Sequence, residues 1–279
     1  MATSGPLIGT AGWSIPRAVA DRFPSEGSGL ERYAAVFDAV EINSTFYRSH
    51  RASTFLRWAM RTPDSFRFSV KAPRAITHEA RLVDGAEALG RFLSELEALR
   101  AKLGVLLVQL PPSLAFDPAV AEAFFGALRA RETELQVACE PRHGSWLSPA
   151  ANELLVGFRI ARVAADPALH PLSGEPGGWT GLSYFRLHGA PRMYYSAYGP
   201  EAVRTLARRL EGDRSGMAWC VFDNTTLGAA AADALELKRV LARAPARPAF
   251  STRGGAPLEL TASGRVRRQR AAMIRASRE

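Results

Sequence analysis

Eight short runs of apolar and β-branched residues recur along the chain, separated by polar segments in which apolar residues recur at helical spacing. The runs that predict β-strands are residues 6–13, 38–43, 66–72, 103–110, 135–140, 159–166, 182–189 and 217–224. The run LGVLLVQL at 103–110 is apolar almost throughout, as expected for a parallel strand that is covered on both faces. Strands buried in this way need covering helices, which the intervening segments should supply.

Start signals for helices lie in those intervening segments. Three pairs place a capping residue before a proline at the first helical position: Asp117-Pro118, Ser148-Pro149 and Gly199-Pro200. Apolar residues follow at helical spacing, such as Val120 and Phe124 after the first pair. A further helix around Phe55 and Trp58 should end before Pro63, because proline cannot continue it.

The order of these elements predicts the fold class. Strand alternates with helix eight times in about 240 residues, which favours an α/β fold of the (β/α)8 TIM-barrel type, with an open doubly wound sheet as the alternative. Residues 167–180 are too rich in Pro and Gly for a helix, so an irregular loop should follow the sixth strand. We expect one barrel domain at 1–248 and a C-terminal extension at 249–279.

Charge and hydropathy narrow the class of protein. The chain is 47% hydrophobic and carries a net charge of +9, of which more than half lies in the arginine-rich tail at 265–279. Such a tail can bind nucleic acid through phosphate contacts, or it is simply a solubilising terminus. No segment approaches the run of about 20 apolar residues that a membrane helix needs, and the start lacks a secretory signal. We therefore expect a cytoplasmic protein without membrane contact.

Lysine and cysteine are both rare in this chain; one lysine is a candidate functional residue, whereas both cysteines are expected to be structural. Only three of the 36 Lys and Arg residues are lysines, namely Lys71, Lys102 and Lys238. Lys71 ends the third predicted strand, which makes it a candidate functional residue. Cys139 and Cys220 lie in separate apolar runs and predict small buried side chains rather than a zinc site or a disulfide.

Polar residues gather where the predicted strands end. In a TIM barrel the active site lies at the carboxyl ends of the strands. The residues there are Trp13, Glu41, Asn43, Lys71, Gln109, Glu140, Arg142, His143, Asp166, Arg186, His188, Asp223 and Asn224. Burying so many polar groups is costly unless they pair or meet a ligand, so a ring of structural salt bridges is the alternative to a binding site.

Seven stretches in order carry a resemblance to a known family: GTAGWS, VEINSTFYR, FSVKAPRAITH, VQLPPS, CEPRHGSW, FRLHG and FDNTTLGAAAADAL. Over residues 5–243 the chain resembles the YecE-like family, known as domain of unknown function 72. The resemblance implies a TIM barrel and brings no established reaction. It also implies signature positions at Trp13, Glu41, Asn43, Tyr47, Lys71, Gln109, Glu140, Arg142, His143, Trp146, Arg186, His188 and Gly189. Asp223-Asn224 departs from the two adjacent asparagines common in the family, which adds a possible negative charge.

The candidate catalytic residues are Glu41, Lys71, Glu140, His143 and His188. A strand lysine can form a Schiff base, act as a base, or hold an anion as a point charge. The last two are expected, because carboxylates at Glu41 and Glu140 should keep Lys71 protonated. An ion pair between Lys71 and Glu41 is the structural alternative. Glu41 or Glu140 with His143 or His188 could supply an acid and a base on opposite sides of a substrate.

The candidate substrate-binding residues are Trp13, Asn43, Tyr47, Gln109, Arg142, Trp146, Arg186, Tyr195, Tyr198 and Asn224. Arg142 and Arg186 would hold an anion together with Lys71. The loop HGAPRMYYSAYGP leads into a predicted helix, at a place where many barrels bind phosphate; alternatively its tyrosines only pin the loop. His78, in the loop after the third strand, is predicted to lie at the surface.

No cofactor is predicted. A divalent metal held by Glu41, Glu140, Asp166, His188 and Asp223 is an alternative, but the neighbouring cations favour anion binding. The leading hypothesis is an enzyme, an isomerase, lyase or hydrolase, that acts on a small polar or anionic, sugar-phosphate-like substrate by acid/base chemistry. The alternatives are a nucleic-acid-binding or phosphodiester-processing barrel and a ligand-binding barrel without catalysis.

Overall fold

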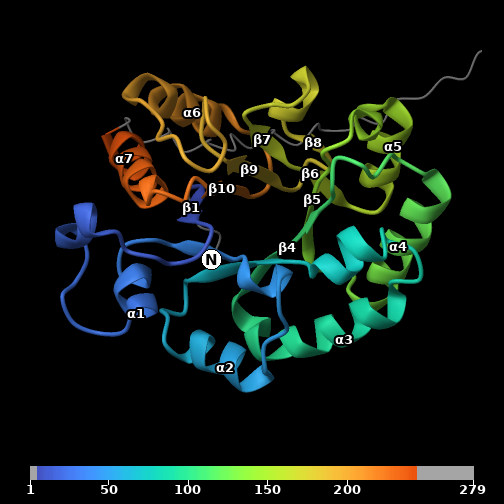
Figure 1. The fold of residues 1–279 in the computed structure, drawn as a ribbon, viewed down its shortest axis with the longest axis horizontal. Helices are drawn as coiled ribbons and strands as arrows, with labels where there is room; N and C mark the ends of the chain where they lie inside the picture. Colours follow the sequence, from blue (N-terminus) through green and yellow to red (C-terminus); the bar gives the residue numbers. More distant parts are fainter. Residues whose placement is uncertain (1–4, 244–279) are drawn as a thin grey trace, which may run out of the picture. The chain divides into compact units, whose positions relative to one another are not determined.

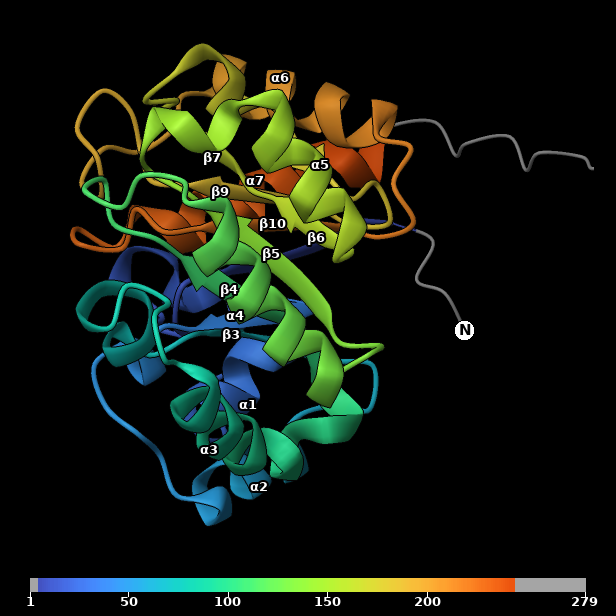
Figure 2. The same ribbon diagram turned by 90° about the vertical axis from the view of Figure 1, so that its right-hand side faces the viewer.

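The computed structural model of the chain describes residues 5–243 (Figures 1 and 2). Its strands are β1 (Leu7–Thr10), β2 (Ala39–Ile42), β3 (Arg67–Lys71), β4 (Leu103–Gln109), β5 (Gln136–Glu140), β6 (Ile160–Arg162), β7 (Ala164–Asp166), β8 (Gly177–Gly178), β9 (Ser183–Leu187) and β10 (Ala218–Phe222). All eight predicted runs contain strand, and Val163 divides the sixth run into β6 and β7.

The α-helices are α1 (Gly29–Ala34), α2 (Ala52–Met60), α3 (Ala86–Leu96), α4 (Pro118–Arg131), α5 (Pro149–Gly157), α6 (Pro200–Gly212) and α7 (Ala229–Arg243). Short 3-10 helices span Arg17–Arg22, Ser44–Phe46, Glu97–Lys102, Gly144–Leu147 and Pro171–Gly174, and a π-helical turn spans Ala75–Glu79. Three α-helices begin at the prolines that predicted them. Asp117 caps α4 by accepting from the backbone N–H of Ala119 and Val120, which that turn cannot otherwise pair.

The strands form two sheets whose members are parallel, apart from the short β8. One sheet has the order β1-β10-β9-β7 and the other β2-β3-β4-β5-β6-β8. The sheets meet at two places. Ala11 bridges in parallel to Glu41, which joins the end of β1 to β2, and the chain runs directly from β6 into β7. Because the strands are parallel, their carboxyl ends lie at one edge, where the polar residues were expected.

Two apolar clusters account for the alternation along the strands. Leu106 and Val108 of β4 belong to the larger cluster, which is shared with the helices, whereas Val105 and Leu107 belong to a second cluster built mainly from strand residues. The strands therefore bury both faces, which explains why β4 is apolar throughout. Figures 1 and 2 show the strands in the interior with the helices around them.

The stretch 167–180 has no α-helix between its ends, as predicted; it holds the 3-10 turn Pro171–Gly174 and β8, which pairs antiparallel with β6. In the described range 5–243, no helix is long and apolar enough to cross a membrane. The predicted extension at 249–279, with its arginine tail, lies outside the described residues.

Candidate functional site

The carboxyl ends of β2, β5 and β9 bring three predicted site residues into one buried cluster. Arg186 of β9 donates from Nε and Nη2 to the two carboxylate oxygens of Glu41 on β2, at 2.9 and 2.7 Å. Its Nη1 donates to Glu140 Oε2 on β5 at 2.9 Å. The three side chains are at most 1% exposed. A buried carboxylate needs such a partner, since an unpaired charge inside a protein is very costly.

Asp223, directly after β10, adds a third carboxylate to the cluster. Its Oδ2 lies 2.9 Å from Arg186 Nη2 and 3.1 Å from His188 Nδ1. The Arg186 guanidinium therefore contacts carboxylates from β2, β5 and the end of β10, and four of its five N–H groups face a carboxylate oxygen. These contacts favour a structural role for Arg186, which organises the acidic groups, over the predicted role of holding a substrate anion.

His188 lies between two of these carboxylates. Its Nε2 is 3.0 Å from Glu140 Oε1, while its Nδ1 faces Asp223. The His188 ring therefore bridges the carboxylates of Glu140 and Asp223, and these two contacts fix its orientation. Burial alone would raise the pKa of Glu140, but Arg186, His188 and Arg142 outweigh it and hold that pKa well below its usual range.

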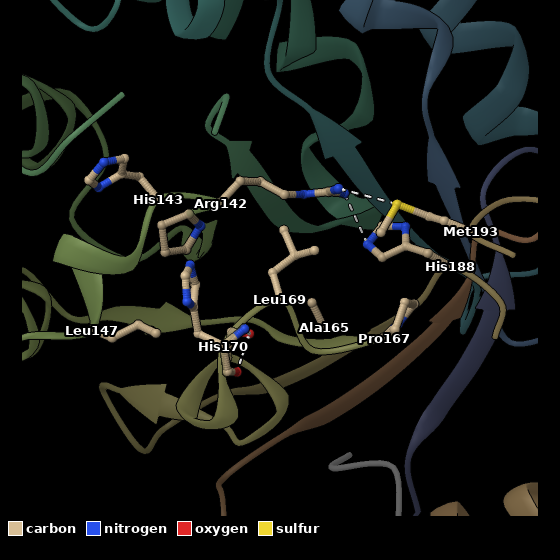
Figure 3. Close-up of a pocket in the computed structure, with 11 residues that line it drawn as sticks. Arg142, His143, Leu147, Ala165, Pro167, Leu169, His170, His188 and Met193 are labelled. Carbon is tan, nitrogen blue, oxygen red and sulfur yellow. Dashed lines mark hydrogen bonds between the residues drawn. The ribbon is translucent and has the colours of Figure 1, made fainter. Parts of the chain in front are cut away.

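Arg142, in the loop after β5, contacts two members of the cluster and also Met193, in the loop after β9 (Figure 3). Its Nη2 lies 2.8 Å from Glu140 Oε1 and 3.2 Å from His188 Nε2, and its Nη1 contacts the sulfur of Met193. The Arg142 side chain is 12% exposed, compared with 1% for Arg186. Of the two arginines expected to hold an anion, Arg142 is the one whose guanidinium keeps contact with solvent.

Lys71 stands beside this cluster but is not bonded into it. Its ammonium makes no hydrogen bond or ion pair within residues 5–243, although the residue is only 6% exposed. The ion pair with Glu41 is absent because Arg186 occupies both carboxylate oxygens. The nearest partner is the face of the Phe46 ring, whose centroid lies 4.1 Å from Nζ.

The pKa of Lys71 is set by opposing contributions. Burial, and then the positive charge of Arg186, lower the pKa of Lys71 to about 8, while Glu41, Glu140 and Asp223 act in the opposite direction. The carboxylates have the expected sign, but burial and Arg186 outweigh them. With a pKa of about 8, most of Lys71 is still protonated at pH 7, as predicted, and a minor fraction is neutral.

Phe46 and His78 are two residues that the sequence did not place in this region. The His78 ring packs edge-on against Phe46 with centroids 4.9 Å apart, so both lie next to Lys71. Burial and then Lys71 lower the pKa of His78. His78 belongs to the π-helical turn Ala75–Glu79, a rare structure that occurs often at functional sites. His78 is half-buried, whereas the sequence predicted a position at the surface. A π-helical turn does not follow the 3.6-residue period of an α-helix, so that period could not have located His78 from the sequence.

Several predicted site residues lie near the cluster with their polar groups engaged elsewhere. Gln109 donates to the Leu110 carbonyl, and Asn224 donates to the Ser196 carbonyl and to Asp233. The Tyr198 hydroxyl donates to Asp166 Oδ1 at 2.7 Å and accepts from the Gly189 N–H at 2.9 Å. This bonding pins the loop after β9, which was the alternative reading of its tyrosines.

Asn43 and Asn224 share a feature: the side-chain Oδ1 of each is enclosed and has no hydrogen-bond partner in the described part of the chain. Asn43 directly follows β2 and precedes the 3-10 turn Ser44–Phe46. An enclosed carbonyl oxygen without a donor is rare in proteins, so Asn43 is a good place for a donor supplied from outside.

The remaining predicted residues lie outside the charged cluster. Trp146 is buried against Phe116 and donates to the Leu114 carbonyl, and Trp13 packs edge-on against Trp58. Tyr47 is 71% exposed and Tyr195 stacks under Arg192. His143 Nδ1 lies 2.8 Å from Ser145 Oγ, and Figure 3 shows the ring on the far side of the drawn residues from His188. His143 and His188 are therefore not interchangeable proton carriers.

Two hollows border the site. A narrow one of about 10 Å3, drawn in Figure 3, lies between Arg142, His188, Met193 and the loop 167–173, with room for about one water molecule. A surface groove of about 320 Å3 lies between the loop after β2, the π-helical turn and α3, with Phe46 in its wall. Among residues 5–243 no group of three His, Cys, Asp or Glu side chains is arranged to hold a metal ion.

Comparison with known proteins places this arrangement in a family. The model of the family described as "Protein of unknown function DUF72" matches residues 7–255. The chain belongs to the DUF72 family. The "UPF0759 protein YecE" of Escherichia coli is 32% identical over 146 residues, and the "UPF0759 protein YunF" of Bacillus subtilis is 27% identical over 176 residues. These alignments cover 52% and 61% of this chain, and 52% and 60% of the relatives. The chain thus spans about half the length of the first of these relatives.

Solved DUF72 structures share the fold. A DUF72 family protein of Thermotoga maritima superimposes with a TM-score of 0.71 at 27% identity, covering 85% of this chain and 99% of that protein. A DUF72 family protein of Enterococcus faecalis gives a TM-score of 0.69 at 21% identity, covering 85% of this chain and 95% of that protein. The mixed α/β fold with parallel sheets is therefore a property that this chain shares with the family.

Proposed function

We propose that this DUF72 protein is an enzyme that acts on a small polar, anionic metabolite of the sugar-phosphate class by acid/base chemistry. We further propose that its two parallel sheets form a (β/α)8 barrel, with the site at the carboxyl ends of the strands. The barrel is supported by the bridge from β1 to β2, the direct run from β6 to β7, and the inner apolar cluster.

The observation that carries the proposal is the ammonium of Lys71, which is nearly buried and has no hydrogen-bond or ion-pair partner within the described residues. The carboxylates Glu41, Glu140 and Asp223 are all bonded to Arg186, and Glu140 is also bonded to Arg142. Lys71 is therefore the cation beside this cluster that has no carboxylate partner within the described residues. An anion placed there would supply the missing partner.

The other groups have separate roles in this proposal. Arg142 reaches the same cluster from the solvent side and donates to the bound anion or to the substrate next to it. Glu140 and His188 share a hydrogen bond and move a proton between them, and Asp223 orients the His188 ring from its other nitrogen. Arg186 and Glu41 fix the positions of these groups.

Thermal unfolding with a panel of anions tests the proposal. Inorganic phosphate, a triose phosphate, a hexose phosphate and citrate are each added to the wild type, to Lys71→Met and to the control Lys238→Met. We expect at least one anion to raise the midpoint of the wild type and of Lys238→Met by several degrees and to leave Lys71→Met unchanged, because ligand binding stabilises only the folded state that holds the site. Equal shifts in all three proteins, or no shift in any, would reject the proposal.

A further inference from the structure

The three lysines of this chain differ in what their ammonium groups contact. Lys102 donates to the carbonyl oxygens of Ala59 and Thr62 at 2.7 and 2.6 Å, and also lies 3.3 Å from Thr62 Oγ1. Lys238 donates to the Val36 carbonyl and to Asp38 at 2.7 and 2.8 Å. Among the described lysines, Lys71 is the one whose ammonium makes no hydrogen bond.

Burial alone does not distinguish Lys71, because Lys102 is enclosed to a similar extent, at 8% exposed against 6%. Burial lowers the pKa of both side chains. Lys102, however, donates to the carbonyl oxygens of Ala59 and Thr62, and a reaction at its nitrogen would have to break these hydrogen bonds. The ammonium of Lys71 makes no hydrogen bond within the described residues and lies over the ring of Phe46.

The position of Lys71 places its amine beside the charged cluster. Lys71 is the last residue of β3, at the carboxyl ends of the strands, and Nζ is not among the side-chain atoms in residues 5–243 that are both fully enclosed and without a hydrogen-bond partner.

We infer that Lys71 is a carbonyl-reactive amine, and that the substrate of this site is an aldehyde or ketone that carries an anionic group. The inference rests on the proposed function and narrows its substrate class. A partly neutral amine is the nucleophile that Schiff-base chemistry requires, and desolvation beside another cation, here Arg186, is one way in which such lysines are activated.

The reaction balances with the groups at hand. The lone pair of Nζ attacks the carbonyl carbon, the C=O π bond breaks, and one proton passes from Nζ to the carbonyl oxygen to give a carbinolamine. The C–O bond then breaks, and one added proton converts the leaving hydroxyl into water, while the lone pair of Nζ forms the C=N bond of a protonated imine. One amine, one carbonyl and one proton thus give one iminium ion and one water.

His78 is placed to carry these protons. Its Nδ1 lies 2.9 Å from Thr77 Oγ1, and its Nε2 has no hydrogen-bond partner among the described residues. The ring packs on Phe46 next to Lys71, and its lowered pKa leaves it available as a base near neutral pH. The groups already bonded in pairs, Glu140 with His188 and Glu41 with Arg186, need not break their contacts for this step.

Reductive trapping on the full-length wild type tests the inference. The protein is treated at pH 7 with glyoxylate, a small anionic aldehyde, and with cyanoborohydride, which reduces an imine to a stable secondary amine. Peptide mapping by mass spectrometry then measures labelling at each lysine and separates it from the α-amino group. At pH 7 about a tenth of an amine with a pKa of about 8 is neutral, against roughly one part in 2,500 at the ordinary lysine pKa of about 10.4.

We expect labelling at Lys71 to be at least about 10-fold faster than at Lys102 and Lys238, to require the reductant, and to disappear in Lys71→Met while the other two lysines keep their rates. The comparison is discriminating because Lys238 has the more exposed side chain, at 30%. Equal rates, or an order that follows exposure with Lys238 first, would overturn the inference.

The unfolding and trapping experiments together distinguish a failure of the proposed function from a failure of this inference. If anions still stabilise the wild type but not Lys71→Met, and trapping at Lys71 stays at the level of the other lysines, the anion site stands and the Schiff-base chemistry is wrong. If Lys71 is trapped but no anion shifts the unfolding midpoint, the reactive amine stands and the anionic substrate is wrong.

Discussion

Arg186 and Glu41 form a two-pronged ion pair across the interior of the protein, with Nε to Oε2 at 2.9 Å and Nη2 to Oε1 at 2.7 Å. The two residues are 145 positions apart in the chain and both are almost fully enclosed. The pair links β9 to β2, and through Glu140 and Asp223 it links both to β5 and β10.

Replacing Arg186 should lower the free energy of unfolding more than replacing its partner Glu41. Arg186→Met leaves the buried carboxylate of Glu41 without a cation and removes one cationic partner from Glu140 and Asp223, so we expect the free energy of unfolding to fall by about 3–5 kcal/mol. Glu41→Gln keeps a hydrogen-bond acceptor and should cost less. Urea unfolding at pH 7 measures both, with Arg91→Ala, in an exposed pair with Glu87, as the control that changes little. A smaller loss for Arg186→Met than for Glu41→Gln would contradict this account of the cluster.

Acid should destabilise the protein through Glu140 and Asp223. The pKa of each is lowered in the folded state; burial opposes the shift, but Arg186 and His188 outweigh it. A lowered carboxyl pKa contributes stability that is present above the unfolded value of about 4 and is lost as the pH falls toward the folded value. We expect the urea midpoint of the wild type to drop steeply below about pH 5, and the slope to be shallower in Glu140→Gln. Parallel slopes would show that Glu140 is not the source.

The buried Lys71 should lower the free energy of unfolding of the protein at neutral pH. Its folded pKa of about 8 lies below the unfolded value, so the unfolded chain binds more protons between about pH 8 and 10.5 and the contribution of Lys71 to stability rises across that range. Lys71→Met should therefore be neutral or stabilising, by up to about 3 kcal/mol at pH 7, and the gain should shrink toward pH 10. Unfolding free energies of both proteins at the two pH values measure this. A destabilised Lys71→Met at pH 7 would contradict it.

The ring of Phe46 should hold part of the charge on Lys71. A cation–π contact of this kind is worth about 0.5–1 kcal/mol, so Phe46→Leu should lower the pKa of Lys71 further, by roughly 0.4–0.7 units. The pH dependence of Lys71 acetylation by acetic anhydride, followed by peptide mapping, measures the change. Lys102 in the same sample is the control, because it is similarly buried and its bonding does not involve Phe46. An unchanged profile at Lys71 would mean that the ring does not stabilise the ammonium.

Local patterns predicted the elements well because they depend on neighbouring residues. The period of apolar positions marks each strand, and Asp117-Pro118 starts α4 through bonds within its own first turn. The same patterns predicted which residues end the strands. Glu41, Glu140, Arg186 and His188 proved to be neighbours because parallel strands bring their carboxyl ends to one edge.

The sequence could not predict which of these neighbouring residues form ion pairs with each other. Two cations, Lys71 and Arg186, were candidates for the same carboxylate, and only the side-chain geometry decides between them. Arg186 presents a planar fork that fits Glu41, and its remaining N–H groups reach Glu140 and Asp223. Lys71 is then left without a hydrogen-bond or ion-pair partner among the described residues, so the structural alternative, an ion pair with Glu41, is absent.

The sequence by itself determined the order of strands and helices, the side of the fold that carries the polar residues, and the membership of the DUF72 family, since each depends on patterns within or between short segments. The tertiary structure decided which charges meet, where the π-helical turn places His78, and that the amine of Lys71 lies over the ring of Phe46. The physical reason is that pairing and pKa depend on burial and on distances between residues far apart in the chain, and neither is encoded in any one segment.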